Sequence, residues 1–431
     1  MAPLAKTLRF CQMISKRFAS PDARLGLGIN AKTGTNRAWT LPGRRFLHTM
    51  TYRLFGTPAS LYTGKARSYL IKQHISFENM AAGDPHFRNS ILPKIGRWII
   101  PVLECPDGTL VQDSSEIIEY FEAGGTVPYP ARPTTALHRL VGQIFELFGG
   151  EGLLRPAMHY RWNFDDANMP FLSQDFPAAL APPNATFEER SNIFAMASQR
   201  MRKAMSSFGV SAQTAPAIEE SYSEFLHLLN THFQDSPYLL GGRPTIGDYG
   251  LIAPLYAHLG RDPFPAQLMK SGAHRVWRWV ERMNAPDLDS GEYAGADPGL
   301  FKNDGVPEGL KQLLRYIAKD YLPEIEAFVG FTNKWLTTHP QIEAGTNGLP
   351  RRQDRVIGQV EFIWRGYPIR VAVMPYRLFL LQKIHAVLDQ APRPDRGKMN
   401  ALLNETGLSK LGELRASRRI IRDGNLEVWS E

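Results

Sequence analysis

Three short stretches between residues 60 and 114 carry the polar groups best suited to hold a small molecule. Ser60 follows a short apolar run and precedes a helical pattern. A hydroxyl at that place can donate a hydrogen bond to a thiolate and lower the thiol pKa from about 8.5. The helix N-terminus adds partial positive charge there. Plain helix capping is the alternative interpretation, and Tyr62 and Thr63 carry the nearest other hydroxyls.

The second and third stretches offer backbone groups and a charged helix start. Ile100 and Pro101 open a predicted strand over Trp98–Leu103, where proline is tolerated. If their peptide bond is cis, the Ile100 backbone turns outward and offers N–H and C=O to an extended peptide. Asp113-Ser114 precedes a helical pattern. The N–H groups there can take a carboxylate and Asp113 an ammonium, so the pair suits an amino-acid zwitterion. Capping is again the alternative.

A small α/β unit must position these groups. Residues 52–122 alternate between short strand-like runs and helical patterns in a βαβ…ββα order. The Gly- and Pro-rich residues 123–133 predict a linker, and beyond them apolar residues recur at helical spacing. The predicted helices cover residues 135–149, 188–208, 218–233, 245–259, 272–283 and 309–335, the last divided at Pro323.

The last hundred residues change character. Residues 360–373 predict a β-hairpin that turns near Gly366, and residues 376–388 return to helix. Residues 391–431 are polar and partly basic, which predicts a segment that lies on the surface or frays. The predicted domains are a basic leader (1–50), an α/β domain (51–125), a helical domain (134–300) and a helical extension with the hairpin (301–431).

Composition and charge argue against several classes of protein. Residues 1–50 carry nine Lys or Arg and one acid, Asp22, so they account for the whole net charge of +8. The remaining chain is neutral, which argues against a nucleic-acid partner. Without a run of 18 apolar residues, a membrane span is not expected. Two cysteines, Cys11 and Cys105, argue against a disulfide framework or a Cys-based zinc site, and no metal site is predicted.

The leader is rich in arginine and poor in acids, which is typical of an organellar presequence. Lys16–Ser20 resembles a mitochondrial processing site. The alternatives are a disordered basic tail or a true start at Met50. The expected location is the mitochondrion, with the cytoplasm as the alternative.

Taken together, Ser60, Ile100-Pro101 and Asp113-Ser114 resemble in order and spacing the glutathione site of the glutathione S-transferase family. That family places a catalytic Ser, Tyr or Cys at the first helix, a Val/Ile-cis-Pro, and a Glu/Gln/Asp-Ser before the third helix. The resemblance implies that Ser60 is catalytic and that Ile100, Pro101, Asp113 and Ser114 bind glutathione. It covers roughly residues 52–285.

Two further segments carry the resemblance. Tyr238–Asp248 is similar to the family's C-terminal signature, in which Thr245 and Asp248 form an S/T-x-x-D capping arrangement that we interpret as structural. Gln112–Ile118 and His159–Phe164 are similar to a longer, poorly characterised, often bacterial branch of the family. The first helix carries no Cys, so the serine-type classes fit better than the cysteine-dependent ones.

The resemblance implies a fold, a cosubstrate and a reaction. The fold is a thioredoxin-like α/β domain followed by an all-α domain, here with an additional C-terminal β-hairpin and helix extension. Glutathione is the cosubstrate with no bound cofactor, and the family is usually homodimeric. Its thiolate would attack a small electrophile or a peroxide. The alternative is a non-catalytic binding or scaffold protein that uses the extension for partners.

The second substrate of the family lies between its two domains. By position, Tyr160 and Trp162 are the predicted lining residues of that pocket, with Arg155 and His159 as secondary candidates. Core packing is the alternative for the aromatic residues, and a surface or capping role is the alternative for His159.

Overall fold

The first part of the described chain is a four-stranded sheet with the strand order β2-β1-β3-β4. The computed structural model describes residues 51–125 and 127–431, so the predicted leader and its mitochondrial interpretation lie outside the described residues. Strand β1 runs parallel to β2 and antiparallel to β3, and β3 runs antiparallel to β4. The strands are β1 (Tyr52–Gly56), β2 (Phe77–Ala81), β3 (Val102–Glu104) and β4 (Leu110–Gln112). The predicted βαβ…ββα order is confirmed.

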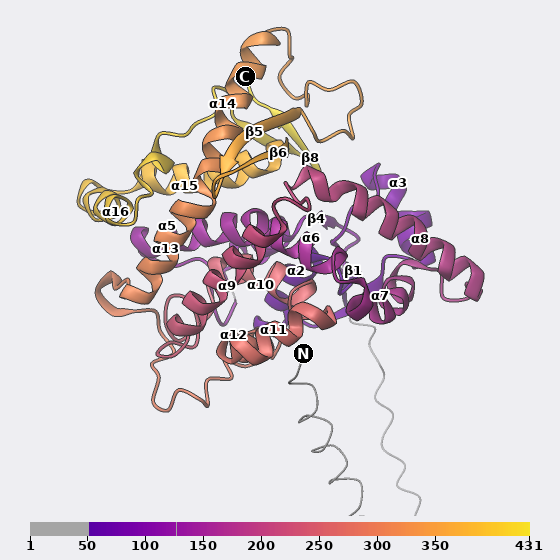
Figure 1. The fold of residues 1–431 in the computed structure, drawn as a ribbon, viewed down its shortest axis with the longest axis horizontal. Coiled ribbons are helices and arrows are strands. Elements are labelled where there is room, and N and C mark those ends of the chain that lie inside the picture. The colour runs from indigo at the N-terminus through magenta and orange to yellow at the C-terminus, as the bar shows by residue number, and fades with distance from the viewer. Residues whose placement is uncertain (1–50, 126) are drawn as a thin grey trace, which may run out of the picture. The chain divides into compact units, whose positions relative to one another are not determined.

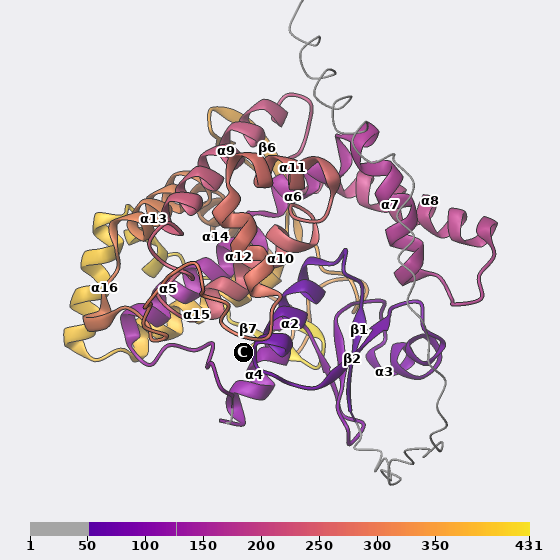
Figure 2. The same cartoon turned by 90° about the horizontal axis from the view of Figure 1, so that it is seen from below.

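Helices cover both faces of this sheet (Figure 2). Helices α2 (Leu61–Lys72) and α4 (Ser114–Ala123) lie on one side, and the turn formed by η1 (Phe87–Ile91) and α3 (Leu92–Ile95) lies on the other. Successive residues of a strand point to opposite faces. Leu54 therefore joins the main core, whereas Phe55 joins a separate small cluster with Phe87 and Val102.

The remainder of the chain up to residue 338 is helical. All six helices predicted there are present, and the break near Pro323 falls between α13 and α14. Helices α6, α7 and α11 were not predicted: α6 is buried on every side and so lacks amphipathic spacing, and α7 contains two prolines. The helices are α5 (Ala136–Leu147), η2 (Phe148–Gly152), α6 (Leu154–Trp162), α7 (Asp165–Leu180), α8 (Phe187–Ala204), η3 (Met205–Ser207), α9 (Ala215–His232), α10 (Ile246–Ala257), α11 (Pro263–Gly272), α12 (His274–Met283), η4 (Lys302–Asp304), α13 (Glu308–Asp320) and α14 (Leu322–Thr338).

Helix α10 lies at the centre of the core and contacts α2, α5 and η2. Its start has the predicted capping box, in which the Asp248 carboxylate accepts from the Thr245 N–H at 2.9 Å. The same carboxylate also accepts from the Leu239 N–H at 3.0 Å. A Cβ on Gly149 would lie 2.4 Å from the Gly250 carbonyl carbon, so this close approach of η2 to α10 requires glycine.

The C-terminal extension is folded to its end (Figure 1). The predicted hairpin is present as β5 and β6, with its turn at Arg365-Gly366, and α15 packs against α5. Of the two predictions for residues 391–431, a surface position agrees with the many exposed side chains of the segment. Fraying is wrong, because the segment forms α16 and a second hairpin whose Val428 and Trp429 are buried. The elements are β5 (Gly358–Trp364), β6 (Tyr367–Val373), α15 (Pro375–Gln390), α16 (Arg393–Glu405), η5 (Ser409–Gly412), β7 (Ile420–Asp423) and β8 (Leu426–Trp429).

None of the helices in the described ranges is both long enough and apolar enough to cross a lipid bilayer.

Acidification from pH 6.5 to 4 is expected to destabilise the fold through His232 at the end of α9. Its Nε2 donates to the Leu239 carbonyl at 3.0 Å, and burial lowers the pKa of His232 to about 4. The pKa of this histidine in the unfolded chain is about 6.5. The neutral, buried form of His232 therefore makes its full contribution to the free energy of unfolding above pH 6.5, and this contribution is lost as the pH falls through 4. The free energy of unfolding decreases by about 3 kcal/mol over that range. Urea unfolding of the wild type and His232→Gln at pH 7 and pH 4 measures it, and equal pH dependence in both proteins would contradict the prediction.

Candidate functional site

Ser60 is the N-cap of α2. Its Oγ accepts a hydrogen bond from the Thr63 N–H at 3.3 Å, and its side chain is half-buried. Ser60 therefore caps α2, as the capping interpretation predicts, but this role occupies only an acceptor lone pair of its hydroxyl. Accepting through a lone pair leaves the O–H group able to donate to a second atom.

The two alternative hydroxyls are engaged or enclosed. The Tyr62 hydroxyl donates to Glu151 Oε1 at 2.9 Å, and burial, reinforced by the Glu151 charge, raises the pKa of Tyr62 well above its ordinary value. The Thr63 hydroxyl is buried, and a Cβ placed on Gly56 would lie 2.5 Å from it. Ser60 thus remains the best placed of the three hydroxyls to reach a ligand.

The second and third predicted stretches lie next to each other. The Ile100–Pro101 peptide bond is cis, and the Pro101 carbonyl accepts from the Asp113 N–H at 3.4 Å. Asp113 caps α4 by accepting from the Ser115 N–H at 2.8 Å. The Ser114 hydroxyl is buried and has no hydrogen-bond partner in the described part of the chain. Buried hydroxyls are normally paired, so Ser114 has an unused group at the place predicted to hold a zwitterion.

The C-terminal extension reaches this same place. The Tyr376 hydroxyl of α15 donates to Asp113 Oδ1 at 3.2 Å, and its ring meets the Tyr62 ring edge-on at 6.3 Å between centroids. From β7, Arg422 Nη2 donates to Gln112 Oε1 at 2.9 Å. The extension therefore contacts the predicted glutathione residues directly, which the sequence analysis did not foresee.

A buried chain of charges connects α2 to the extension. Tyr62 is bonded to Glu151 of η2, and Arg377 of α15 donates through Nε to Glu151 Oε2 at 3.0 Å. Arg377 also pairs with Glu324 of α14, which in turn pairs with Arg155 of α6. The ionic side chains are each at most 5% exposed. Helix α15 is thus attached to the core by ion pairs out of contact with water.

Arg161 of α6 fixes the backbone directly before Ser60. It binds the Asp262 carboxylate through Nε at 2.6 Å and Nη2 at 2.9 Å. Its Nη1 donates to the Ala59 carbonyl at 2.9 Å, and its Nη2 also donates to the Ala257 carbonyl at 2.6 Å. Both charged side chains are buried. Arg161 lies between two residues that the sequence analysis singled out, yet it was not predicted.

The predicted residues of the second-substrate pocket lie in the core. Tyr160 and Trp162 are 3% and 2% exposed; Tyr160 stacks on Phe164, and Trp162 contacts Phe176 edge-on. This placement favours the core-packing alternative and gives no support to a role in contacting a substrate. The helix carrying them is buried on all sides, so no side of it is left to line a pocket.

The two secondary candidates are buried as well. Arg155 donates to the Phe208 carbonyl at 3.0 Å in addition to its pair with Glu324. The His159 Nε2 lies 3.0 Å from Glu219 Oε1, and burial lowers the pKa of His159. Neither residue is placed to act as a base on a bound molecule.

The cysteine within the described chain is not a nucleophile in this conformation. Cys105 is a buried free thiol, and burial raises its pKa above the ordinary value. Nucleophilic cysteines have a lowered pKa and some exposure. Within residues 51–125 and 127–431, His, Cys, Asp and Glu side chains do not gather into a group of three or more that could hold a metal ion.

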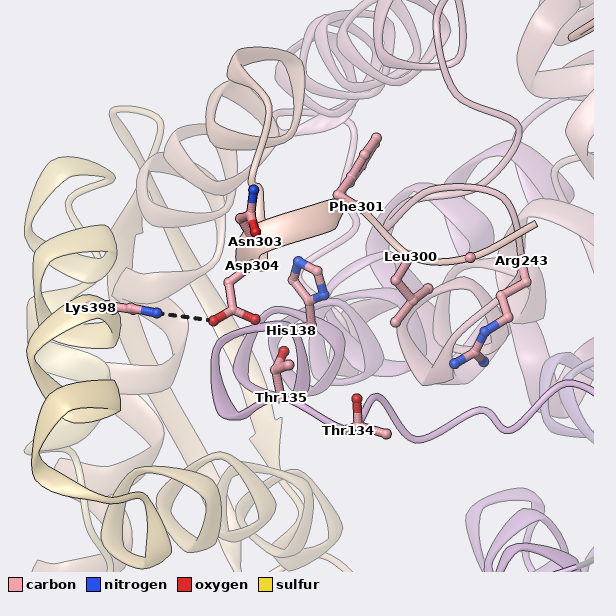
Figure 3. Close-up of a pocket in the computed structure, with 10 residues that line it drawn as sticks. Thr134, Thr135, His138, Arg243, Leu300, Phe301, Asn303, Asp304 and Lys398 are labelled. Carbon is pink, nitrogen blue, oxygen red and sulfur yellow. Dashed lines mark hydrogen bonds and ion pairs between the residues drawn. The ribbon is translucent and has the colours of Figure 1, made fainter. Parts of the chain in front are cut away.

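A cavity of about 530 Å³ lies at the start of α5 (Figure 3). Lys398 and Asp304 form an ion pair of 3.2 Å at one end, and His138 donates to the Gly305 carbonyl at 3.0 Å. Ser60, Ile100, Pro101, Asp113 and Ser114 are not among the described residues that line it. The cavity is therefore separate from the predicted glutathione site.

Comparison with known proteins supports the N-terminal assignment. Residues 54–124 match the family model for the N-terminal domain of glutathione S-transferase, a segment that contains all five predicted catalytic and glutathione-binding residues. No curated protein sequence matches the chain.

Several solved structures are similar in fold. β-Etherase LigF from Sphingobium sp. strain SYK-6 is 18% identical over 56% of this chain and 97% of its own, with a TM-score of 0.39. A glutathione S-transferase from Rhodospirillum rubrum F11 is 15% identical over 61% and 99%, with a TM-score of 0.36. One from Methylobacterium radiotolerans, in complex with glutathione sulfonate, is 18% identical over 58% and 96%, with a TM-score of 0.33. Residues 54–124 of the chain therefore form a domain of the glutathione S-transferase N-terminal family.

Proposed function

We propose that the chain is a glutathione transferase that binds glutathione across Ser60, Ile100-Pro101 and Asp113-Ser114. The observation that carries the proposal is the half-buried Ser60 hydroxyl at the start of α2, in a domain that also presents the buried Ser114 hydroxyl, which has no partner among the described residues. In this proposal the N–H groups at the start of α4 take the γ-glutamyl carboxylate. Ile100 pairs with the cysteinyl backbone, and Ser60 donates to the sulfur.

The chemical step follows from that arrangement. The Ser60 O–H stabilises the thiolate over the thiol, and the positive end of α2 acts in the same direction. The thiolate sulfur forms a bond to an electrophilic carbon while the bond from that carbon to its leaving group breaks. With an aryl halide, the halide ion departs with the bonding electrons, so no other reactant is consumed.

Replacing Ser60 with alanine is expected to lower turnover with an aryl halide about 10-fold to 100-fold, the value of one hydrogen bond to a charged group. Retention on immobilised glutathione should persist, because binding rests on the other residues. Thiolate absorbance in the ultraviolet should show that bound glutathione has a lower thiol pKa in the wild type than in Ser60→Ala. Tyr62→Phe is the matched control, since that hydroxyl already bonds Glu151. Full activity in Ser60→Ala would disprove the assignment.

A binding protein without turnover is the second candidate. It is favoured by the hydrogen bond from Tyr376 to Asp113, because the extension occupies an acceptor that a glutathione ammonium would use. Measuring glutathione binding together with the rate of conjugation distinguishes the transferase from the binding protein. Glutathione binding with conjugation no faster than the uncatalysed rate would support the binding protein, and faster conjugation would exclude it.

A further inference from the structure

A second cavity lies between α4, α5 and α15, where helix α15 of the extension packs beside α5 (Figure 1). Its volume is about 450 Å³, which is within the range of cavities that hold small molecules. None of the residues predicted to be catalytic or to bind glutathione is among the described residues that line it. It is also distinct from the cavity at the start of α5, because the two share no described lining residue.

Helix α5 brings three unpaired polar atoms to this cavity. Arg139, Gln143 and Glu146 follow the i, i+4, i+7 spacing that places residues on one side of a helix, and all three line the cavity. The Nε of Arg139, the Oε1 of Gln143 and the Oε2 of Glu146 are buried, and none has a hydrogen-bond partner in the described part of the chain. Buried polar atoms are normally paired, so this side of α5 has one donor and two acceptors left for a ligand.

Glu146 is the most deeply buried of the three, with a side chain that is 1% exposed. Its Oε1 accepts from Lys65 Nζ at 2.6 Å and from Ser115 Oγ at 2.9 Å, which leaves Oε2 without a donor among the described residues. Burial opposes ionisation, but the charges of Lys383 and Lys65 outweigh it and lower the pKa of Glu146 to about 2. The unpaired oxygen therefore belongs to a carboxylate, which favours a positively charged donor such as an ammonium group.

The charges around the cavity balance. Arg132 pairs with Glu119, and Lys65 pairs with Glu146. The charged lining residues that remain are two of each sign: Arg139, Lys383, Glu116 and Glu122. Burying a charge without compensation is costly, so a ligand that carries one charge of each sign fits this lining better than an ion of a single sign.

The spacing of the unpaired atoms and the apolar part of the lining indicate the size of the ligand. Arg139 and Glu146 are separated by about 10.5 Å along the helix axis. Two hydrogen bonds of about 3 Å each take up most of this distance, so the charged groups of the ligand must lie close together, as they do in a single amino acid. The other helices contribute apolar side chains: Ile118 of α4, and Phe379 and Val387 of α15.

We propose that this cavity binds a free amino acid with an apolar side chain. Arg139 binds the carboxylate, and Gln143 Oε1 and Glu146 Oε2 accept from the ammonium group. The apolar side chain of the ligand is buried against the apolar residues of α4 and α15. The site depends on the extension, because α15 forms one of its walls, and it does not depend on the proposed transferase reaction.

The test is calorimetric titration of the full chain with phenylalanine and with two analogues that each lack one charge, phenylalaninamide and N-acetylphenylalanine. The wild type should bind phenylalanine about 10-fold or more tightly than either analogue, because each analogue loses a hydrogen bond between charged groups. In Arg139→Gln, phenylalanine and phenylalaninamide should bind with similar affinity. In Gln143→Leu, the preference for phenylalanine over N-acetylphenylalanine should fall. Arg352→Gln changes an exposed arginine that pairs with Asp423 at 2.6 Å, and this control should keep both preferences.

Both variants remove an atom that has no partner among the described residues, so neither is expected to weaken the fold, and urea unfolding checks this. A wild type that does not bind phenylalanine, or that binds all three compounds equally, would overturn the inference. A folded Arg139→Gln variant that keeps the preference for phenylalanine over phenylalaninamide would overturn it as well. Each of these results leaves the proposed function standing, because Ser60→Ala tests that function separately.

Discussion

Replacing Arg377 with methionine will lower the free energy of unfolding by about 3–5 kcal/mol. Arg377 lies between Glu151 and Glu324, and all three side chains are at most 5% exposed. Methionine fills a similar volume but leaves Glu151 with the Tyr62 hydroxyl as its hydrogen-bond donor. Breaking one side of a buried ion pair is far more costly than losing a surface pair, because the stranded charge keeps its desolvation penalty. Urea unfolding at pH 7 measures the loss.

A control variant and a double variant identify which carboxylate is left without a partner when Arg377 is replaced. Arg393→Met makes the same chemical change at an exposed position at the start of α16 and is expected to cost no more than about 0.5 kcal/mol. Adding Glu151→Gln to Arg377→Met removes the unpaired charge and keeps an acceptor for Tyr62. The double variant should therefore be more stable than Arg377→Met alone. Strictly additive effects would contradict a direct interaction.

The pH dependence gives a second check on the same variant. Burial already raises the pKa of Glu151, and losing Arg377 must raise it further. A carboxyl whose folded pKa is raised contributes stability below its unfolded pKa of about 4.3 and loses it as the pH rises through the folded pKa. The difference in free energy of unfolding between the wild type and Arg377→Met should therefore be larger at pH 8 than at pH 5. A difference that is smaller at pH 8 would exclude Glu151 as the carboxylate left without a partner.

The thioredoxin-like unit was predictable because its signals are local. Ser60 and Asp113 cap helices that begin within a residue of each, and the hairpin of β5 and β6 turns at the glycine that its alternation indicates. Helix α6 was missed for a physical reason: it is buried on every side, so its sequence shows no apolar stripe. The last hairpin was missed because its two strands are only four residues long and their apolar residues stand among charged ones.

The contacts that surround the candidate site could not be predicted in the same way. Tyr376 is 263 residues from the aspartate it binds, and no spacing rule connects the two. The available signal was weaker: Glu151 and Arg377 are charged residues inside otherwise apolar helical stretches. Such a residue must find a buried partner of opposite charge, so a sequence can indicate that an ion pair exists without indicating which residues form it.

Arg161 bonds both the buried Asp262 carboxylate and the Ala59 carbonyl, and its variants should separate the contributions of these two contacts. Its carboxylate partner, Asp262, is fully buried, so Arg161→Met strands a charge and is expected to cost about 3–5 kcal/mol in unfolding free energy. Arg202→Met is the control: Arg202 is 34% exposed and pairs with Asp165 at 2.7 Å. Its loss should cost about 1 kcal/mol or less. Comparable losses in both variants would contradict the role of burial.

Arg161→Lys keeps the positive charge beside Asp262 but cannot form the two parallel bonds and also reach the Ala59 carbonyl. Part of the stability should therefore survive, whereas the turn that ends at Ser60 loses its fixed carbonyl. Under the proposed function, kcat with an aryl halide should fall about 10-fold, because the hydroxyl no longer meets the sulfur in a fixed geometry, while KM for glutathione changes less. A folded Arg161→Lys protein with wild-type kcat would show that Arg161 stabilises the core without positioning Ser60.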